Sequence, residues 1–104
     1  WVSACLLNNN TLYIYDSLGQ KNERVNDDLL KKILNKNHIT PYYYNNKSQT
    51  DLSNWCGYFS IVVVEHMKRI KNKNIDNFNN MIDSLFGDDK IPTKTDEITI
   101  LNNL

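Results

Sequence analysis

Short strand-like apolar runs and longer helical stripes alternate along this chain of 104 residues. Residues 1–7 (WVSACLL) form a compact apolar run, and residues 11–15 (TLYIY) are rich in β-branched and aromatic side chains, so both are predicted to be strands. Three asparagines, residues 8–10, lie between them, and Asn tolerates the left-handed backbone that tight hairpins need. We therefore expect an N-terminal β-hairpin that ends in a turn at residues 16–19.

Two later segments show the spacing of amphipathic helices. Residues 25–35 are predicted to be a helix that Asn26 caps and Asn37 ends, and residues 75–86 a second helix with Gly87 as its C-cap. Residues 39–44 (ITPYYY) are predicted to be a third strand, which Pro41 would confine to a sheet edge. The two helical stripes consist of Leu29, Leu30, Ile33 and Leu34 in the first helix, and Ile75, Phe78, Met81, Ile82 and Leu85 in the second.

The apolar run at residues 59–67 (FSIVVVEHM) has the composition of a strand but the length of a helix of about four turns. We predict a helix that begins near Cys56, with Ser53 or Asn54 as N-cap, and that is central and buried on most sides. Alternating helices and a small sheet predict an α+β fold of one domain.

Cys56 stands where the polar loop at residues 45–54 meets this helix. The helix N-terminus favours a thiolate, and Gly57 leaves room for a close approach by a backbone or a substrate. Gln49, seven residues upstream, offers an amide N–H to a developing oxyanion. These are features of a cysteine nucleophile. The alternative is that Cys56 is a small core hydrophobe, which is the usual state of a free Cys.

Composition narrows the class of function. Twelve basic and twelve acidic residues cancel, so the chain lacks the charge of a nucleic-acid-binding or anionic-membrane-binding protein. Cys5 and Cys56 form no disulfide framework or CxxC motif, which favours a reducing intracellular setting, in the cytoplasm or nucleus or inside a host cell. No paired metal ligands and no glycine-rich phosphate loop occur in the sequence, so we expect no cofactor.

The order of Trp1, Asp16, Gln49 and Cys56-Gly57 resembles the cysteine proteases that include the SUMO- and NEDD8-specific proteases and the adenovirus-type protease. In that family a His-Trp pair opens a strand, an acid ends a later strand, and a Gln precedes a Cys-Gly pair. The spacing of seven from Gln49 to Cys56 is similar to that of the adenovirus-type enzymes. The resemblance covers residues 1–67 and implies a papain-like fold and hydrolysis of a peptide or isopeptide bond in a ubiquitin-like conjugate or a polyprotein.

The resemblance also implies a role for each residue. Cys56 would be the nucleophile, Asp16 would orient the catalytic imidazole, and Gln49 would bind the oxyanion. Trp1 would either roof the substrate cleft or pack in the core, and Trp55, where SUMO proteases carry Asp, would alter how a substrate tail is held. Asp16 and Gln49 also have plain interpretations, as a turn-capping residue and a solvated loop residue.

The family's catalytic His corresponds to the position directly before Trp1, so we expect the chain to be the C-terminal part of a longer catalytic domain and to be inactive alone. His66, ten residues after Cys56, would lie about 15 Å along the helix and is predicted to be structural. His38 is predicted to lie at a helix-to-strand connection. Two other classes stay open: an inactive relative that only binds a protein partner, and a structural interaction domain with Cys56 in its core.

Overall fold

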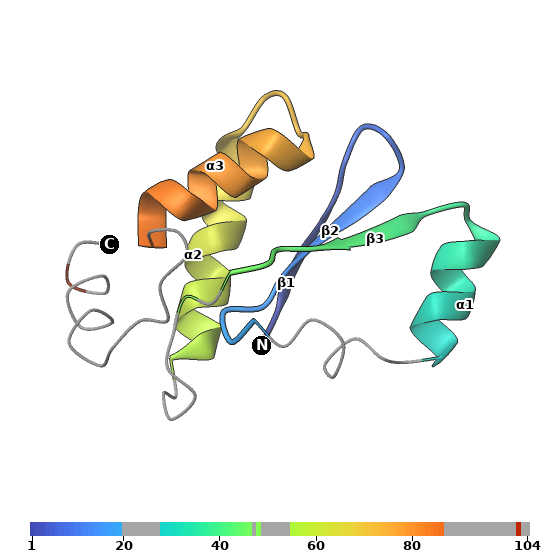
Figure 1. The fold of residues 1–104 in the computed structure, drawn as a ribbon, viewed down its shortest axis with the longest axis horizontal. Coiled ribbons are helices and arrows are strands. Elements are labelled where there is room, and N and C mark those ends of the chain that lie inside the picture. The colour runs from blue at the N-terminus through green and yellow to red at the C-terminus, as the bar shows by residue number, and fades with distance from the viewer. Residues whose placement is uncertain (20–27, 47, 49–54, 87–101, 103–104) are drawn as a thin grey trace.

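The computed structural model describes residues 1–19, 28–46, 48, 55–86 and 102, which form three strands and three helices (Figure 1). The strands are β1 (Ser3–Leu6), β2 (Thr11–Tyr15) and β3 (Thr40–Tyr43), in the sheet order β1-β2-β3. The helices are α1 (Asp28–Lys36), α2 (Cys56–Arg69) and α3 (Ile75–Phe86). The described part of the chain is thus a small α+β domain, as the sequence predicts.

The predicted hairpin is confirmed. β1 runs antiparallel to β2, with Ser3 opposite Tyr15, and the Leu7 N–H donates to the Thr11 carbonyl oxygen at 2.8 Å. Asn10 has a φ of 59°, the left-handed backbone expected of this Asn-rich turn. β1 is shorter than predicted, because only residues 3–6 of the predicted strand pair with β2.

β3 lies parallel to β2 at an edge of the sheet, the position predicted for a strand that contains Pro41. Parallel strands need a long crossover, and α1 lies within it. α1 ends one residue later than predicted, because His38 adopts the left-handed conformation (φ 56°) while the Ile39 N–H donates to the Leu34 carbonyl oxygen. The proposed Asn26 cap lies outside the described residues.

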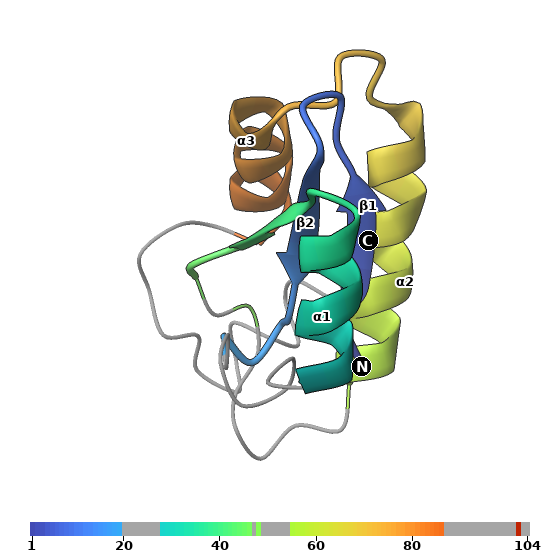
Figure 2. The same cartoon turned by 90° about the vertical axis from the view of Figure 1, so that its right-hand side faces the viewer.

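Aromatic side chains between the sheet and two helices form the core. Tyr13 in β2 makes an edge-on contact with Phe78 of α3, and Phe59 of α2 packs against Phe86 at 5.1 Å between ring centroids. α2 and α3 lie together beside the hairpin, whereas α1 lies at the far end of the molecule next to β3 (Figures 1 and 2). The fully buried large side chains are Tyr13, Tyr15, Phe59, Phe78, Ile82 and Val63.

The expectation that α2 is buried on most sides is wrong. Its buried residues, Phe59, Ser60, Val63 and Met67, form one stripe along the helix. Tyr58 and Ile61 are 44% and 58% exposed, because within the described residues β1 and α3 cover only one side of α2. The stripe predicted for α1 is likewise narrower than expected. Leu34 is buried but Ile33 is 50% exposed, and of Leu29 only its helical backbone is described.

The residue at the N-cap of α2 differs from the two that the sequence predicts. Trp55 occupies the N-cap position of α2 without a side-chain hydrogen bond, and its carbonyl oxygen accepts the Phe59 N–H at 3.1 Å. The two predicted caps, Ser53 and Asn54, lie outside the described residues. At α3, Asn74 Oδ1 accepts the Asn77 N–H at 2.8 Å, which is the capping interaction that satisfies a free helical N–H. The Gly87 C-cap also lies outside the described residues.

The buried tyrosines predict loss of stability at alkaline pH. Burial is the largest cause that raises the pKa of both Tyr13 and Tyr15 above the usual value of 10.0. The folded protein therefore keeps these protons where the unfolded chain releases them, so the free energy of unfolding should fall as pH rises above about 10. Denaturant unfolding at pH 8 and pH 11 measures this fall. Tyr15→Phe should make the loss of stability between pH 8 and pH 11 smaller. The same change at exposed Tyr58 should leave that loss unchanged. An equal pH dependence of stability in the two variants would contradict the prediction.

Candidate active site

The thiol of Cys56 lies at the start of α2, next to the first residue of the chain. The Trp1 nitrogen is 4.0 Å from Cys56 Sγ, so the start of the hairpin and the N-terminus of α2 meet (Figure 2). Cys56 is a free thiol and is half-buried, which does not fit the alternative of a core cysteine. At this end of a helix the first backbone N–H groups have no intrahelical acceptor.

Two contacts hold the hairpin on α2. Ser3 is 3% exposed, and its Oγ donates to the Ser60 carbonyl oxygen at 2.6 Å. The Trp1 ring covers Gly57, where an added Cβ would lie 3.2 Å from Trp1 Cδ2. Gly57 therefore permits a close approach, as its position beside Cys56 predicts, and in this structure the group that approaches is the Trp1 ring.

Large apolar side chains are exposed near the start of α2. Trp1 is 71% exposed, which excludes the second of its two predicted placements, the core. Trp55 is 50% exposed. Trp55 makes an edge-on contact with Tyr58, with 6.2 Å between ring centroids. A groove of about 340 Å³ begins at Trp1 and runs between the start of β1 and α2. Its lining consists of Trp1, Val2, Ser3, Ser60, Ile61, Val64 and Glu65.

Asp16 follows β2 directly and is 6% exposed. Its Oδ1 accepts the Leu18 N–H at 3.0 Å, which confirms the turn-capping interpretation. Its Oδ2 is buried and has no hydrogen-bond partner. Because Ser3 pairs with Tyr15, Asp16 lies at the same end of the hairpin as Trp1. The turn thus uses one carboxylate oxygen and leaves the other able to accept a hydrogen bond.

The remaining predicted residues are not brought together with Cys56 by any described contact. Gln49 lies outside the described residues. His66 Nδ1 lies 2.8 Å from the Val62 carbonyl oxygen of its own helix, which fits the predicted structural role. His38 is exposed and lies between α1 and β3, at the helix-to-strand connection predicted for it. Within the described ranges, no group of three or more metal-ligating side chains occurs.

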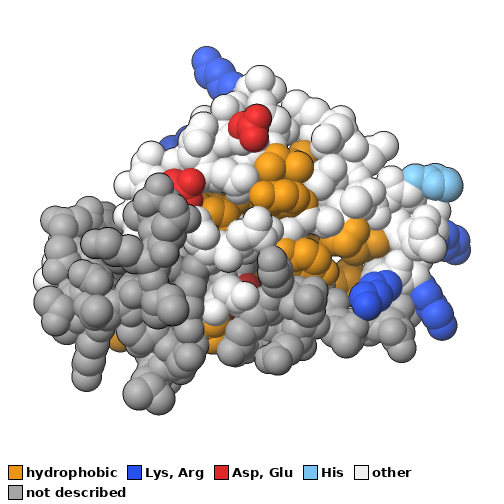
Figure 3. Space-filling view, in the orientation of Figure 1, with side chains coloured by type: hydrophobic (Ala, Val, Ile, Leu, Met, Phe, Trp, Pro, Cys, Tyr) orange, Lys and Arg blue, Asp and Glu red, His pale blue; other side chains and the backbone are white. Residues whose placement is uncertain are grey.

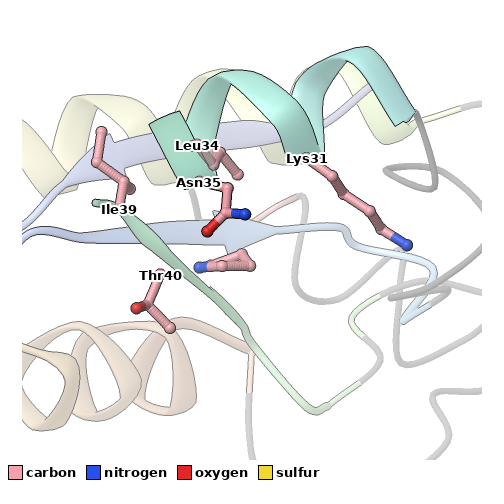
Figure 4. Close-up of a pocket in the computed structure, with 6 residues that line it drawn as sticks. Lys31, Leu34, Asn35, Ile39 and Thr40 are labelled. Atoms are coloured by element: carbon pink, nitrogen blue, oxygen red, sulfur yellow. The ribbon is translucent and has the colours of Figure 1, made fainter. Parts of the chain in front are cut away.

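Two further hollows lie away from these residues. One of about 330 Å³ separates α1 from the start of β3, and Figure 4 shows Asn35 pointing from α1 toward the strands there. Its lining consists of Lys31, Leu34, Asn35, Ile39, Thr40 and Pro41. The other, of about 150 Å³, lies between β3 and α3 and is polar. Sequence analysis missed this polar pocket, although the spacing of two between Tyr42 and Tyr44 and of four between Asn79 and Asp83 places each pair on one face.

Comparisons of the chain with protein-family models, with curated proteins and with solved structures found no match. The described helices also include none that is long and apolar enough to cross a membrane. What can be inferred about activity therefore depends on the arrangement of Trp1, Asp16 and Cys56.

Gly57→Ala should displace the Trp1 ring at little cost in stability. The added methyl group would meet the ring at 3.2 Å, and the ring can move because it is 71% exposed. The better helix propensity of Ala offsets part of the cost, so the free energy of unfolding should change by less than about 1 kcal/mol. In a Trp55→Phe background, Trp1 fluorescence reports the displacement. An unchanged emission spectrum would contradict the contact.

Proposed function

We propose that this protein is a cysteine peptidase or isopeptidase with a papain-like fold, in which Cys56 attacks a ubiquitin-like conjugate or a polyprotein. One observation carries the proposal: the Trp1 nitrogen and Cys56 Sγ are 55 positions apart in sequence and 4.0 Å apart in space. The resemblance to ubiquitin-like-protein proteases requires this neighbourhood, because their catalytic His directly precedes the Trp. A residue joined to the Trp1 nitrogen would stand beside the thiol.

The mechanism follows from general principles of cysteine proteases. The Cys56 thiolate attacks the substrate carbonyl carbon, the C–N bond breaks, and the His imidazolium gives its proton to the leaving amine. Water then hydrolyses the thioester. The unpaired Asp16 Oδ2 supports the role of this residue as the group that orients the imidazole. Gln49 and the Cys56 N–H would bind the oxyanion, and one such donor contributes about 3 kcal/mol.

A second function, protein binding without catalysis, is favoured by the exposed apolar side chains near Cys56. Soluble monomers rarely expose many large apolar residues together unless a partner covers them. The exposed residues are Trp1, Val2, Trp55, Tyr58 and Ile61. A binding module predicts that partner binding survives Cys56→Ala and that no thioester forms.

A ubiquitin-like tail that ends in a thiol-reactive electrophile tests the proposal. Incubated with a form of the protein that carries a His directly before Trp1, the probe should form one covalent adduct, which peptide mass spectrometry should locate at Cys56. Cys5, which lies in β1 and whose Sγ is 3.7 Å from the Leu6 carbonyl oxygen, is the matched control thiol. Equal labelling of both cysteines, or labelling that a scrambled tail reproduces, would refute a substrate-guided nucleophile.

A further inference from the structure

The polar pocket between β3 and α3 contains one charged group, the Asp83 carboxylate. Asp83 is half-buried, and its Oδ1 accepts the Tyr44 hydroxyl at 2.5 Å. Among the described residues its second oxygen, Oδ2, has no hydrogen bond and no ion-pair partner. A carboxylate that is partly withdrawn from water loses solvation, and a neutral hydroxyl compensates only part of its charge. The pocket therefore favours a positively charged occupant.

A chain of hydrogen bonds fixes the walls of the pocket. Tyr13 donates to Asn79 Oδ1 at 2.6 Å, and Asn79 Nδ2 donates to the Tyr42 hydroxyl oxygen at 3.1 Å. Tyr13 is fully buried, so Asn79 is held in one orientation and in turn holds Tyr42. The Tyr42 hydroxyl oxygen uses only one of its two lone pairs in this chain, so the other can accept a hydrogen bond from an ammonium group. On the face in Figure 3, acidic side chains over α3 border hydrophobic side chains between α3 and β3.

The size and the aromatic walls select the class of cation. The pocket holds about 150 Å³, which corresponds to roughly five water molecules of about 30 Å³ each. This volume suits an ammonium group with a short alkyl stem and is too small for a nucleotide. Tyr rings attract a cation placed over their faces within about 6 Å. The lining consists of Tyr42, Tyr44, Asn45, Asn46, Asn79 and Asp83.

We infer that this pocket binds an alkylammonium group, with Asp83 as the counter-charge and the rings of Tyr42 and Tyr44 as walls. Asn46 Nδ2 lies 3.5 Å from the Tyr44 hydroxyl, which places its amide at the pocket. Either a lysine side chain of a protein or a free small amine presents the same chemistry. The site uses none of the residues assigned to peptide hydrolysis, so it stands or fails independently of that function.

A titration of the protein with n-butylammonium, followed by NMR, tests the site. We expect fast-exchange shifts confined to Tyr42, Tyr44, Asn46, Asn79 and Asp83, and weaker shifts with 1-butanol, which has nearly the same shape and no charge. Asp83→Asn keeps an acceptor for Tyr44 and should weaken amine binding at least about tenfold, as expected for loss of a charge-assisted contact. Asp76→Asn, an exposed change of the same charge in α3, is the control and should bind as the native protein does.

Three outcomes would overturn the inference: no localised shifts with the amine, equal shifts with the alcohol, or unchanged binding by Asp83→Asn. If Asp83→Asn lowers the melting temperature and the native protein does not bind the amine, the carboxylate has only a structural role, in which it joins α3 to Tyr44. N-acetyl-lysine-methylamide separates the two sources. Binding as tight as that of n-butylammonium supports a lysine of a partner protein, and exclusion of the larger probe supports a free amine.

Discussion

In a form of the protein that carries a His directly before Trp1, Cys56→Ala should reduce hydrolysis of a ubiquitin-like fusion to the background rate. In the proposed mechanism the Cys56 thiol forms the acyl-enzyme, and no other described thiol lies at a helix start. Asp16→Asn should instead leave a measurable rate, lower by roughly 10²- to 10⁴-fold, because the amide can misorient the imidazole but leaves the nucleophile in place. Steady-state kcat for both variants measures this ranking.

Controls separate chemistry from folding in that experiment. Cys5→Ala removes the other free thiol and should leave kcat within about twofold, since Cys5 lies in β1 away from the start of α2. The Asp16 turn also stabilises the hairpin through the Leu18 N–H, so the melting temperature of each variant must be compared. Full activity of Cys56→Ala would exclude the nucleophile assignment. Partner binding without turnover in the native protein would instead support the binding module.

The strand positions could be predicted from the sequence because their signals are local. The Asn-rich turn and the residues of β2 determine the hairpin, and Pro41 marks the edge strand. The bounds of α3 also match the prediction, since Phe78 and Ile82 repeat at helical spacing and both are buried. Each of these features depends on residues that are close together in the sequence, which is why local sequence patterns predict them.

The exposure of α2 could not be predicted in the same way. An apolar run indicates that a helix can be buried, but which of its sides are covered depends on the number and position of its neighbours. Val63 and Ile61 are both β-branched aliphatic residues, yet Val63 is 0% exposed and Ile61 is 58% exposed. The difference arises because, among the described elements, β1 and α3 cover only one side of α2. The Trp1 nitrogen and Cys56 Sγ belong to residues 55 positions apart, so no local pattern predicts that they meet. The family resemblance only implies this proximity, because it places the catalytic His directly before Trp1.

The polar pocket shows a third limit of sequence analysis. Asn79 and Asp83 have the composition of an ordinary helix surface, and only the packing of α3 against β3 brings them to Tyr42 and Tyr44. The free oxygen of Asp16 has the same origin: a turn Asp can be predicted, but which of its oxygens stays unpaired depends on the tertiary surroundings. Which polar atoms remain without a hydrogen bond can therefore be learned from the structure but not from the sequence pattern.

Phe59→Ala should be among the most destabilising substitutions in this protein. The ring is 0% exposed and packs against Phe86, so truncation removes its burial and leaves a cavity between α2 and α3. Such changes cost about 3–5 kcal/mol, a large share of the roughly 5–15 kcal/mol that stabilises a typical domain. Denaturant unfolding of the two variants Phe59→Ala and Ile61→Ala measures the difference directly.

Ile61→Ala is the matched control because it lies in the same helix, two residues away, and is 58% exposed. It should cost less than about 1 kcal/mol, since little apolar area leaves contact with other side chains. The difference between the two variants measures how one-sided the burial of α2 is in solution. Equal losses would mean that Ile61 is packed as tightly as Phe59, which would contradict the exposed apolar surface beside Cys56 and with it the binding surface inferred there.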